Sequence, residues 1–169
     1  MRKFILSILF CALPLLASAQ VKFGFLSYSQ ALQSMPDYAL AKENLAKLEE
    51  QFETEMKRAE EEFNKKYEEF LEGQQEFAVS IRNKRQSELQ ELMQKNMAFK
   101  QEARRLLKNA EADAMKPLHE KLKAVLAKVG QQRGLAFILN TDGDALPYVD
   151  PAQGEDVTAD VKAELQKMK

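Results

Sequence analysis

The chain has 169 residues, of which 30% are charged, and its formal net charge of −1 is close to neutral. A single cysteine excludes a fold held together by a disulfide framework. We expect no nucleic-acid partner.

Residues 1–19 have the pattern of a secretory signal peptide, so we expect an exported protein. Two basic residues precede an apolar run from Phe4 to Leu16, and Ala17-Ser18-Ala19 is a cleavage signal that places the mature start at Gln20. An anchor helix is the alternative, but the run has roughly 13 residues against the ~20 that span a bilayer. Cleavage would also remove Cys11, the only cysteine.

Residues 21–26 alternate apolar side chains with others and predict a β-strand. Ser27 and Gln30 have the spacing of a capping box, so a short helix should follow and reach about Met35. Pro36 ends that helix and suits the first turn of the next one.

Two long charged helices are predicted between residues 38 and 129, each with one apolar stripe. In the first helix, steps of four and three make an eleven-residue repeat at Ala41, Leu45, Leu48, Phe52, Met56, Ala59, Phe63, Tyr67 and Phe70. In the second helix, the stripe comprises Leu92, Phe99, Ala103, Leu107, Ala110, Ala114, Leu118, Leu122, Val125 and Val129. Asn96 interrupts this second stripe. Stripes this long cannot wrap a globular core, so they predict a protruding antiparallel hairpin.

Residues that favour turns and helix ends set the expected boundaries of the hairpin. We expect the first helix to reach about Phe77 and the turn to lie within residues 77–83. The second helix should run from about Asn83 to Val129, with Gly130 as the residue after its C-cap. Pro117 interrupts this helix at the predicted root of the hairpin, where we expect a bend and a hinge.

The two helices differ in charge. Residues 42–79 hold 6 basic and 12 acidic side chains, whereas residues 80–123 hold 11 basic and 6 acidic ones. This complementarity favours antiparallel docking and specifies orientation more than stability. Two solvated faces of separate helices are the alternative, but no long linker separates the two runs.

The C-terminal part has a different character. Residues 135–139 predict a strand that is apolar on both faces. A turn at residues 140–144 should lead to a second strand at residues 145–149, which Pro147 makes an edge strand or a bulged one. A final helix from residue 156 onward should bury the side chains of Val157, Val161 and Leu165.

The predicted fold class is α+β and mainly α, with three parts: a signal peptide at 1–19, a β-rich body at 20–35 and 124–169, and a hairpin arm at 36–123. So small a body is marginally stable alone, and its doubly apolar strand needs cover on both sides. We therefore expect a homo-oligomer. The number of its subunits does not follow from these residues. The residues expected to hold it together are Phe23, Phe25, Phe137, Ile138 and Leu139.

Catalytic chemistry is not visible in the sequence. His119 is the only histidine, and it sits on a charged helical stretch without a nucleophile nearby in the sequence. No glycine-rich phosphate loop appears. Asp142-Gly143-Asp144 lacks the downstream ligands of a calcium loop and is more typical of a hairpin turn. We expect no enzyme activity, no cofactor and no metal.

Two basic clusters are candidate binding residues. Arg82, Lys84 and Arg85 lie at the predicted tip, and Arg104 and Arg105 lie further along the second helix. They could engage anionic lipid or acidic protein segments. The alternative is that they pair with the acidic first helix.

Four methionines on the predicted helices are a second candidate surface. Met56, Met93, Met97 and Met115 could make adaptable apolar contacts with varied partners, because the methionine side chain is flexible and polarizable. The alternative is that they fill gaps between the two helices.

The order of signal peptide, strand, long hairpin, strands and terminal helix resembles the Skp/OmpH family of periplasmic chaperones. Residues 21–32 look like the family's opening strand and helix, and residues 135–142 look like its C-terminal strand. Asp156-Val157-Thr158-Ala159-Asp160-Val161 resembles the closing D-[IV]-T-A-D-V motif. The resemblance covers the whole mature chain.

The resemblance implies a periplasmic homotrimer whose arms surround a cavity. That cavity would hold unfolded outer-membrane β-barrel proteins without ATP, as a holdase. The resemblance also implies contact with lipopolysaccharide or an anionic membrane through basic residues on the arms, for which Arg104 and Arg105 are the candidates. Well-known members are strongly basic, and this chain departs from them in its slightly acidic balance.

The alternative function is that of a structural coiled-coil adaptor, whose hairpin would dock end-on in an envelope assembly. Such adaptors normally carry flanking lipoyl-like β-domains, and the chain is too short for them. An extracytoplasmic enzyme has no residues in this sequence to support it.

Overall fold

The computed structural model describes residues 21–168, so the predicted signal peptide, its cleavage position and Cys11 lie outside the described residues. The chain divides into two units. Among the described residues, the sheet unit comprises 21–35 and 119–168, and the hairpin unit comprises Pro36–Leu118. The expected roles of a body at 20–35 and 124–169 and an arm at 36–123 stay predictions.

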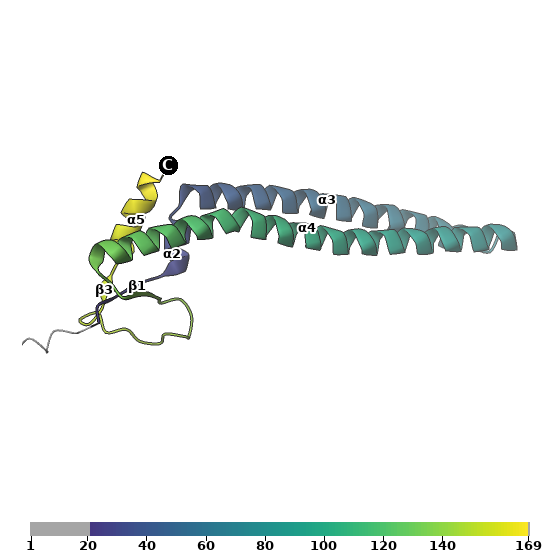
Figure 1. The fold of residues 1–169 in the computed structure, drawn as a ribbon. Helices are drawn as coiled ribbons and strands as arrows, with labels where there is room; N and C mark the ends of the chain where they lie inside the picture. Colours follow the sequence, from purple (N-terminus) through teal and green to yellow (C-terminus); the bar gives the residue numbers. More distant parts are fainter. Residues whose placement is uncertain (1–20, 169) are drawn as a thin grey trace, which may run out of the picture. The chain divides into compact units, whose positions relative to one another are not determined.

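The hairpin unit is built from two long antiparallel helices that lie side by side (Figure 1). α3 spans Pro36–Gly73, and its 38 residues give a length of about 57 Å. α4 spans Val79–Arg133 and has 55 residues, of which those from His119 onward belong to the sheet unit. The fold class expected from the sequence, mainly α with a long helical hairpin and a small sheet, is confirmed.

The apolar stripes form the seam between the two helices. Phe52 of α3 and Phe99 of α4 meet with their ring centroids 6.1 Å apart. Phe70 and Ala103 are buried, whereas Tyr67 leaves the stripe and is 45% exposed. At the far end of the seam, Lys42 and Glu111 lie 3.9 Å apart as an exposed ion pair. The eleven-residue repeat therefore predicts the seam well, because it depends only on local helical geometry.

The turn between the helices comes earlier than expected. α3 ends at Gly73 and α4 already begins at Val79, so the turn occupies residues 74–78 and not 77–83. The backbone amides of Glu76 and Phe77 both donate to the Gly73 carbonyl, at 3.0 and 3.2 Å. The Phe77 ring folds back so closely that a Cβ at Gly73 would lie 2.4 Å from it. A glycine at position 73 allows this close approach.

The C-terminal end of α4 also differs from the prediction. Gly130 lies inside the helix, and Gly134, with φ +65°, is the residue after the C-cap. The Leu135 amide donates to the Gly130 carbonyl at 2.9 Å, and the Gly134 amide donates to the Gln131 carbonyl at 3.2 Å. This is a Schellman motif, and it explains why the later of the two glycines ends the helix.

The sheet unit contains three parallel strands in the order β2-β1-β3. β1 spans Phe23–Leu26, β2 spans Phe137–Asn140 and β3 spans Glu155–Asp156. Phe23 pairs with Phe137 and Phe25 pairs with Leu139 across β1 and β2. The strand near the N-terminus is thus central, and both of its neighbours come from the C-terminal part.

The predicted strand at residues 145–149 and its antiparallel hairpin are wrong, since residues 145–149 form no strand. Residues 141–154 instead make a wide connection that leaves β2 and returns to β3 on the other side of β1 (Figure 1). Pro147 has no backbone N–H to donate to a neighbouring strand, and the Tyr148 side chain is 74% exposed. Gly143, with φ +77°, forms the turn at the start of this connection.

Two short helices complete the sheet unit. α2 spans Tyr28–Gln33, and the Ser27 hydroxyl accepts from the Gln30 amide at 3.2 Å, so the Ser27 cap is confirmed. α5 spans Thr158–Lys167 and buries Val161 and Leu165 as predicted. The core of this unit also contains Leu26, Ala31, Leu32, Met35, Leu122, Val125, Val129 and Val157. Within residues 21–168, no helix has the length and apolar character that crossing a bilayer requires.

Candidate functional site

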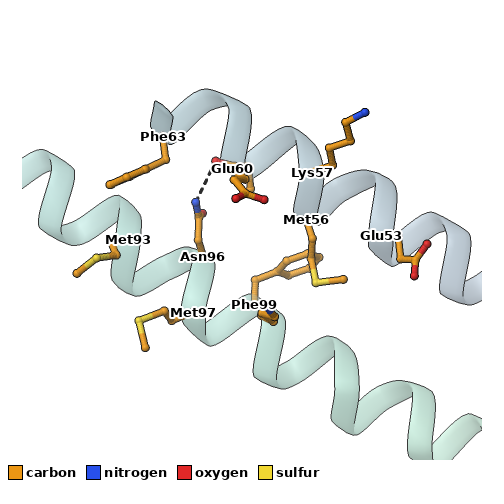
Figure 2. Close-up of a pocket in the computed structure, with 11 residues that line it drawn as sticks. Glu53, Met56, Lys57, Glu60, Phe63, Met93, Asn96, Met97 and Phe99 are labelled. Atoms are coloured by element: carbon orange, nitrogen blue, oxygen red, sulfur yellow. Dashed lines mark hydrogen bonds between the residues drawn. The ribbon is translucent and has the colours of Figure 1, made fainter. Parts of the chain in front are cut away.

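An apolar groove lies between α3 and α4 in the middle of the hairpin unit. It encloses a cavity of about 420 Å³, and Figure 2 shows its lining. The lining residues are Glu53, Met56, Lys57, Ala59, Glu60, Phe63, Met93, Asn96, Met97, Phe99 and Lys100. A second cavity of about 330 Å³ shares Phe63 and Met93 with the first and adds Tyr67, Phe70, Gln86, Leu89 and Gln90. We call the two together the methionine groove.

Asn96 lies at the point where the seam opens. Its side chain takes a stripe position on α4 and points toward α3 (Figure 2), where its Nδ2 donates to the Ala59 carbonyl at 2.9 Å. The groove thus surrounds the one polar interruption that the sequence shows in the stripe.

Two methionines border this interruption and remain open to solvent. Met93 precedes Asn96 by three residues and is 47% exposed, and Met97 follows it and is 57% exposed. Met56 is half-buried in the seam. Of the two interpretations of the methionines, gap filling suits Met56, whereas Met93 and Met97 lie outside the seam. The sequence carries a signal for this, because both positions fall off the apolar stripe.

The rim of the first cavity carries charges of both signs. Glu53, Lys57, Glu60 and Lys100 are all exposed, and Lys57 lies 4.0 Å from Glu61. A rim of mixed charge around an apolar floor favours neither positively nor negatively charged ligands. The groove can therefore bind apolar segments, while its rim stays solvated.

The predicted tip cluster is spread over different surroundings. Arg82 is half-buried and its Nη2 donates to the Phe77 carbonyl at 3.4 Å, while its Nε is buried without a partner among the described residues. Arg85 lies over the Phe77 ring, 4.9 Å from its centroid. Lys84 is 3.6 Å from Glu88. Arg82 and Arg85 therefore meet at Phe77, whereas Lys84 lies beside Glu88 of α4.

Arg104 and Arg105, the second basic pair, also differ in their surroundings. Arg105 makes a two-pronged contact with Glu102, with its Nε 2.8 Å and its Nη2 2.5 Å from the two carboxylate oxygens. The hydrogen bond from Arg105 lowers the pKa of Glu102. Arg104 is exposed and has no ion pair among the residues that the structure describes. Arg104 is thus the more available of the two for an anionic ligand.

The predicted oligomerisation residues lie on two different faces of the sheet. Phe23 and Phe137 stack with centroids 5.8 Å apart, and Phe137 is 48% exposed. Phe25 and Leu139 share this outer face because they pair in register with the same alternation. Ile138 points the other way, toward Gly130 of α4, where an added Cβ would lie 3.6 Å from the isoleucine side chain. The structure thus groups four of the five predicted residues.

Pro117 and His119 lie on either side of the division between the two units along α4. Pro117 is exposed inside the helix, and the division falls after Leu118. Within the sheet unit, the His119 ring stacks on Tyr28, and its Nδ1 is 3.0 Å from the Tyr28 hydroxyl. Partial burial raises the pKa of Tyr28. The hinge expected at Pro117 stays a prediction.

A polar clamp at the start of α2 is a feature that the sequence does not predict. Asp142 accepts from the Ser27 hydroxyl at 2.6 Å and from the Ser29 amide at 2.7 Å. Asn140 accepts from the Tyr28 amide at 3.1 Å. The hydrogen bond from Ser27, followed by that from Ser29, lowers the pKa of Asp142. This clamp joins residues more than a hundred positions apart, so no local pattern could reveal it.

Metal binding finds no support in residues 21–168. No group of three or more His, Cys, Asp or Glu side chains there could hold a metal ion. The interactions that the structure does offer are apolar contacts in the methionine groove and on the outer face of the sheet. Both are surfaces suited to binding another chain.

Comparison with known proteins identifies the family. The profile of the family described as "Outer membrane protein (OmpH-like)" matches residues 22–165. The crystal structure of an outer membrane chaperone candidate (OmpH-like) from Caulobacter crescentus CB15 has a TM-score of 0.73 with this chain. The two are 16% identical, and the match covers 90% of this chain and 88% of that one. No curated protein matches the sequence. The family profile covers nearly all of the described residues, so the chain belongs to the OmpH-like family, as its resemblance to Skp/OmpH proteins predicted.

Proposed function

We propose that this protein is an ATP-independent holdase chaperone of the periplasm. It binds unfolded outer-membrane β-barrel proteins and prevents their aggregation before they reach the membrane. It acts by binding alone, without catalysis and without a cofactor. A chaperone that binds the unfolded state slows aggregation by lowering the concentration of free unfolded chain.

The observation that carries this proposal is the methionine groove on the hairpin unit. Met93, Met97 and Tyr67 expose 47%, 57% and 45% of their surface beside a half-buried floor of seam residues. Barrel proteins expose apolar faces and unpaired strands before insertion. Methionine side chains adapt to many shapes, so one groove can accept varied apolar segments. Membership of the OmpH-like family, and a fold shared with an outer membrane chaperone candidate, support the same function.

We also propose that three chains associate through the outer face of the sheet, so that their hairpin units surround a cavity. Phe23, Phe25, Phe137 and Leu139 give this face an apolar character, and Phe137 remains 48% exposed in the single chain. An exposed phenylalanine on a small sheet is a source of association energy. The number three comes from the resemblance to Skp/OmpH proteins.

For contact with an anionic membrane or with lipopolysaccharide, we propose Arg104 as the principal residue. It is exposed without an ion pair among the described residues, whereas Arg105 is held by Glu102 and Lys84 lies near Glu88. An exposed cation acts mainly on the rate of encounter and loses its effect at high salt.

The end of the hairpin supports the second candidate function, a structural adaptor that docks end-on. Val79 is 68% exposed and Ile81 is 45% exposed, beside Leu71 at 44%. An apolar tip is what end-on docking against another helical assembly would need. We place this second, because the methionine groove lies along the side of the hairpin and an end-on adaptor gives it no role.

The test is suppression of aggregation without nucleotide. An outer-membrane barrel protein is unfolded in urea and diluted into buffer with the mature chain, and light scattering is followed. The wild type should suppress scattering, and Met93→Gln with Met97→Gln should suppress it less. Met168→Gln, at an exposed methionine outside the groove, is the matched control and should behave as wild type.

Two further variants separate the candidate functions. A chain in which residues 48–112 are replaced by a short turn should lose suppression, since it lacks the groove. Val79→Ser with Ile81→Ser should retain suppression if the groove is the binding surface. Suppression that survives the deletion, or that depends on the tip and not on the groove, would overturn the proposal.

A further inference from the structure

Three of the six methionines that the structure describes, Met56, Met93 and Met97, line the methionine groove. The sequence has seven methionines and one cysteine, and Met1 and Cys11 lie outside the described residues. Met35 is 2% exposed, and Met56 and Met115 are half-buried. The exposed thioethers are those of Met93, Met97 and Met168. Two of the three thus line the surface through which we propose that the protein binds its clients.

We propose that Met93 and Met97 are oxidative modification sites, and that their conversion to sulfoxides by hypochlorous acid switches client binding off. This inference rests on the proposed function, since it concerns the same groove. Thioether oxidation follows exposure, so these two should react before Met35, Met56 and Met115. Within residues 21–168 there is no cysteine to compete as a reactive sulfur.

The chemical step is a two-electron oxidation. In net terms, an S–O bond forms and the O–Cl bond of hypochlorous acid breaks. The methionine sulfur loses two electrons, the chlorine leaves as chloride with them, and the proton passes to water. A dithiol-dependent methionine sulfoxide reductase reverses the change, since two thiols become a disulfide and the sulfoxide oxygen leaves as water.

The position of the two side chains explains why binding would be lost. A sulfoxide is polar and chiral, whereas the thioether is apolar and flexible. Met93 lines both cavities, so a single sulfoxide there introduces a polar group into the whole groove. An apolar client segment would then cover an S=O group that has no hydrogen-bond partner in it. Leaving a buried polar group unpaired weakens binding by about tenfold.

The same positions explain why the fold would survive. Met93 and Met97 lie outside the seam, and their exposed side chains contribute little to the packing of α3 on α4. The seam itself is held by residues such as Phe52 and Phe99. The groove can thus lose its apolar character while the helices stay intact. A reversible switch differs in this from oxidative damage, which would unfold the helices.

The experiment treats the mature wild-type chain with increasing hypochlorous acid and maps sulfoxides by peptide mass spectrometry. Met93 and Met97 should be oxidised at lower oxidant than Met35, Met56 and Met115. Helical circular dichroism should stay constant, while the affinity for an unfolded barrel protein falls by about tenfold. Treatment with a methionine sulfoxide reductase and dithiothreitol should restore the affinity.

A variant pair tests the assignment. The double variant Met93→Leu with Met97→Leu and the wild type are each measured before and after oxidation, and each is compared with its own untreated form. Because leucine has no sulfur to oxidise, oxidant should change the client affinity of the double variant less than about twofold. Met168→Leu is the control and should lose affinity on oxidation like the wild type. A fully oxidised wild type that binds clients as well as the untreated chain, or a leucine variant that still loses affinity, would overturn the inference. If the untreated wild type does not bind clients, the proposed function fails instead, and the mass spectra alone then decide whether Met93 and Met97 are the preferred oxidation sites.

Discussion

At the scale of single residues, Asn96 has the widest consequences, because its polar side chain both lines the groove and bonds across the seam. Its bond to the Ala59 carbonyl satisfies one amide proton and aligns the two helices at that level. A single polar residue at a seam position commonly fixes register at some expense of stability.

We expect Asn96→Leu to raise the free energy of unfolding by about 1 kcal/mol, because added apolar burial outweighs the lost hydrogen bond. The larger side chain should also fill the groove and weaken suppression of client aggregation. Urea unfolding and light scattering measure the two effects. Asn109→Leu, at an exposed position of the same helix, is the control and should change neither. A variant that is more stable and still holds clients normally would separate Asn96 from the binding surface.

Asp142 is the second residue whose effect can be measured alone. Its hydrogen bonds to Ser27 and Ser29 lower its pKa in the folded state. The stabilisation is therefore present above the unfolded-state pKa and is lost as pH falls through the lower folded-state value, in the region below about pH 4. Asp142→Asn should be less stable than wild type at neutral pH, and the difference should shrink on acidification.

Urea midpoints measured at neutral pH and near pH 3 test this expectation. The exposed neighbour Asp144 provides the control, and Asp144→Asn should keep the midpoint of the wild type at both pH values. A gap between Asp142→Asn and wild type that stays constant on acidification would show that the carboxylate charge is not what stabilises the clamp.

At the scale of elements, the helices and the strands β1 and β2 were predictable, whereas β3 and the parallel pairing of the strands were not. The stripes of α3 and α4 repeat within a few residues, so the sequence alone places the seam and even marks Asn96. β3 is two residues long, Glu155–Asp156, and is defined only by its pairing with β1. The local pattern predicted a strand at residues 145–149 instead, where apolar residues are plentiful but the chain forms no strand.

The candidate site shows the same limit. Its floor consists of seam residues that the repeat identifies, such as Phe63 and Phe99. That Met93 faces solvent while Met56 is half-buried also follows from the repeat, because Met93 falls off the stripe and Met56 lies on it. The volume of the groove depends on how the two helices pack together, so a single stripe does not predict it.

Pro117 is the irregular feature of α4. Proline has no amide proton, so the Asp113 carbonyl one turn earlier lacks its helical partner. We expect Pro117→Ala to raise the free energy of unfolding by about 1–3 kcal/mol and to stiffen the helix. Spin labels near the hairpin turns of the oligomer should then report a narrower distribution of distances. An unchanged distribution would make Pro117 a tolerated irregularity and place the hinge elsewhere.

At the scale of the whole molecule, the outer face of the sheet should control assembly. We expect Phe137→Asp to dissociate the oligomer, because the charge would replace a 48% exposed ring on the proposed interface. Ile138→Asp is the contrasting variant, since Ile138 faces Gly130 of α4 and its replacement should unfold the sheet unit instead. Multi-angle light scattering with circular dichroism distinguishes a folded monomer from an unfolded chain. A wild type that is monomeric at micromolar concentration would contradict the assembly itself.

The central position of β1 has a consequence for how the chain acquires its structure. β1 pairs with Phe137–Asn140 on one side and with Glu155–Asp156 on the other, so the sheet closes a loop of more than a hundred residues. Closing so long a loop is slow, whereas the hairpin forms from neighbouring segments. Once α3 has packed against α4, Lys42 and Glu111 are 3.9 Å apart. Most of the chain between β1 and β2 is then already ordered. We therefore expect the hairpin to fold first and the sheet to form last.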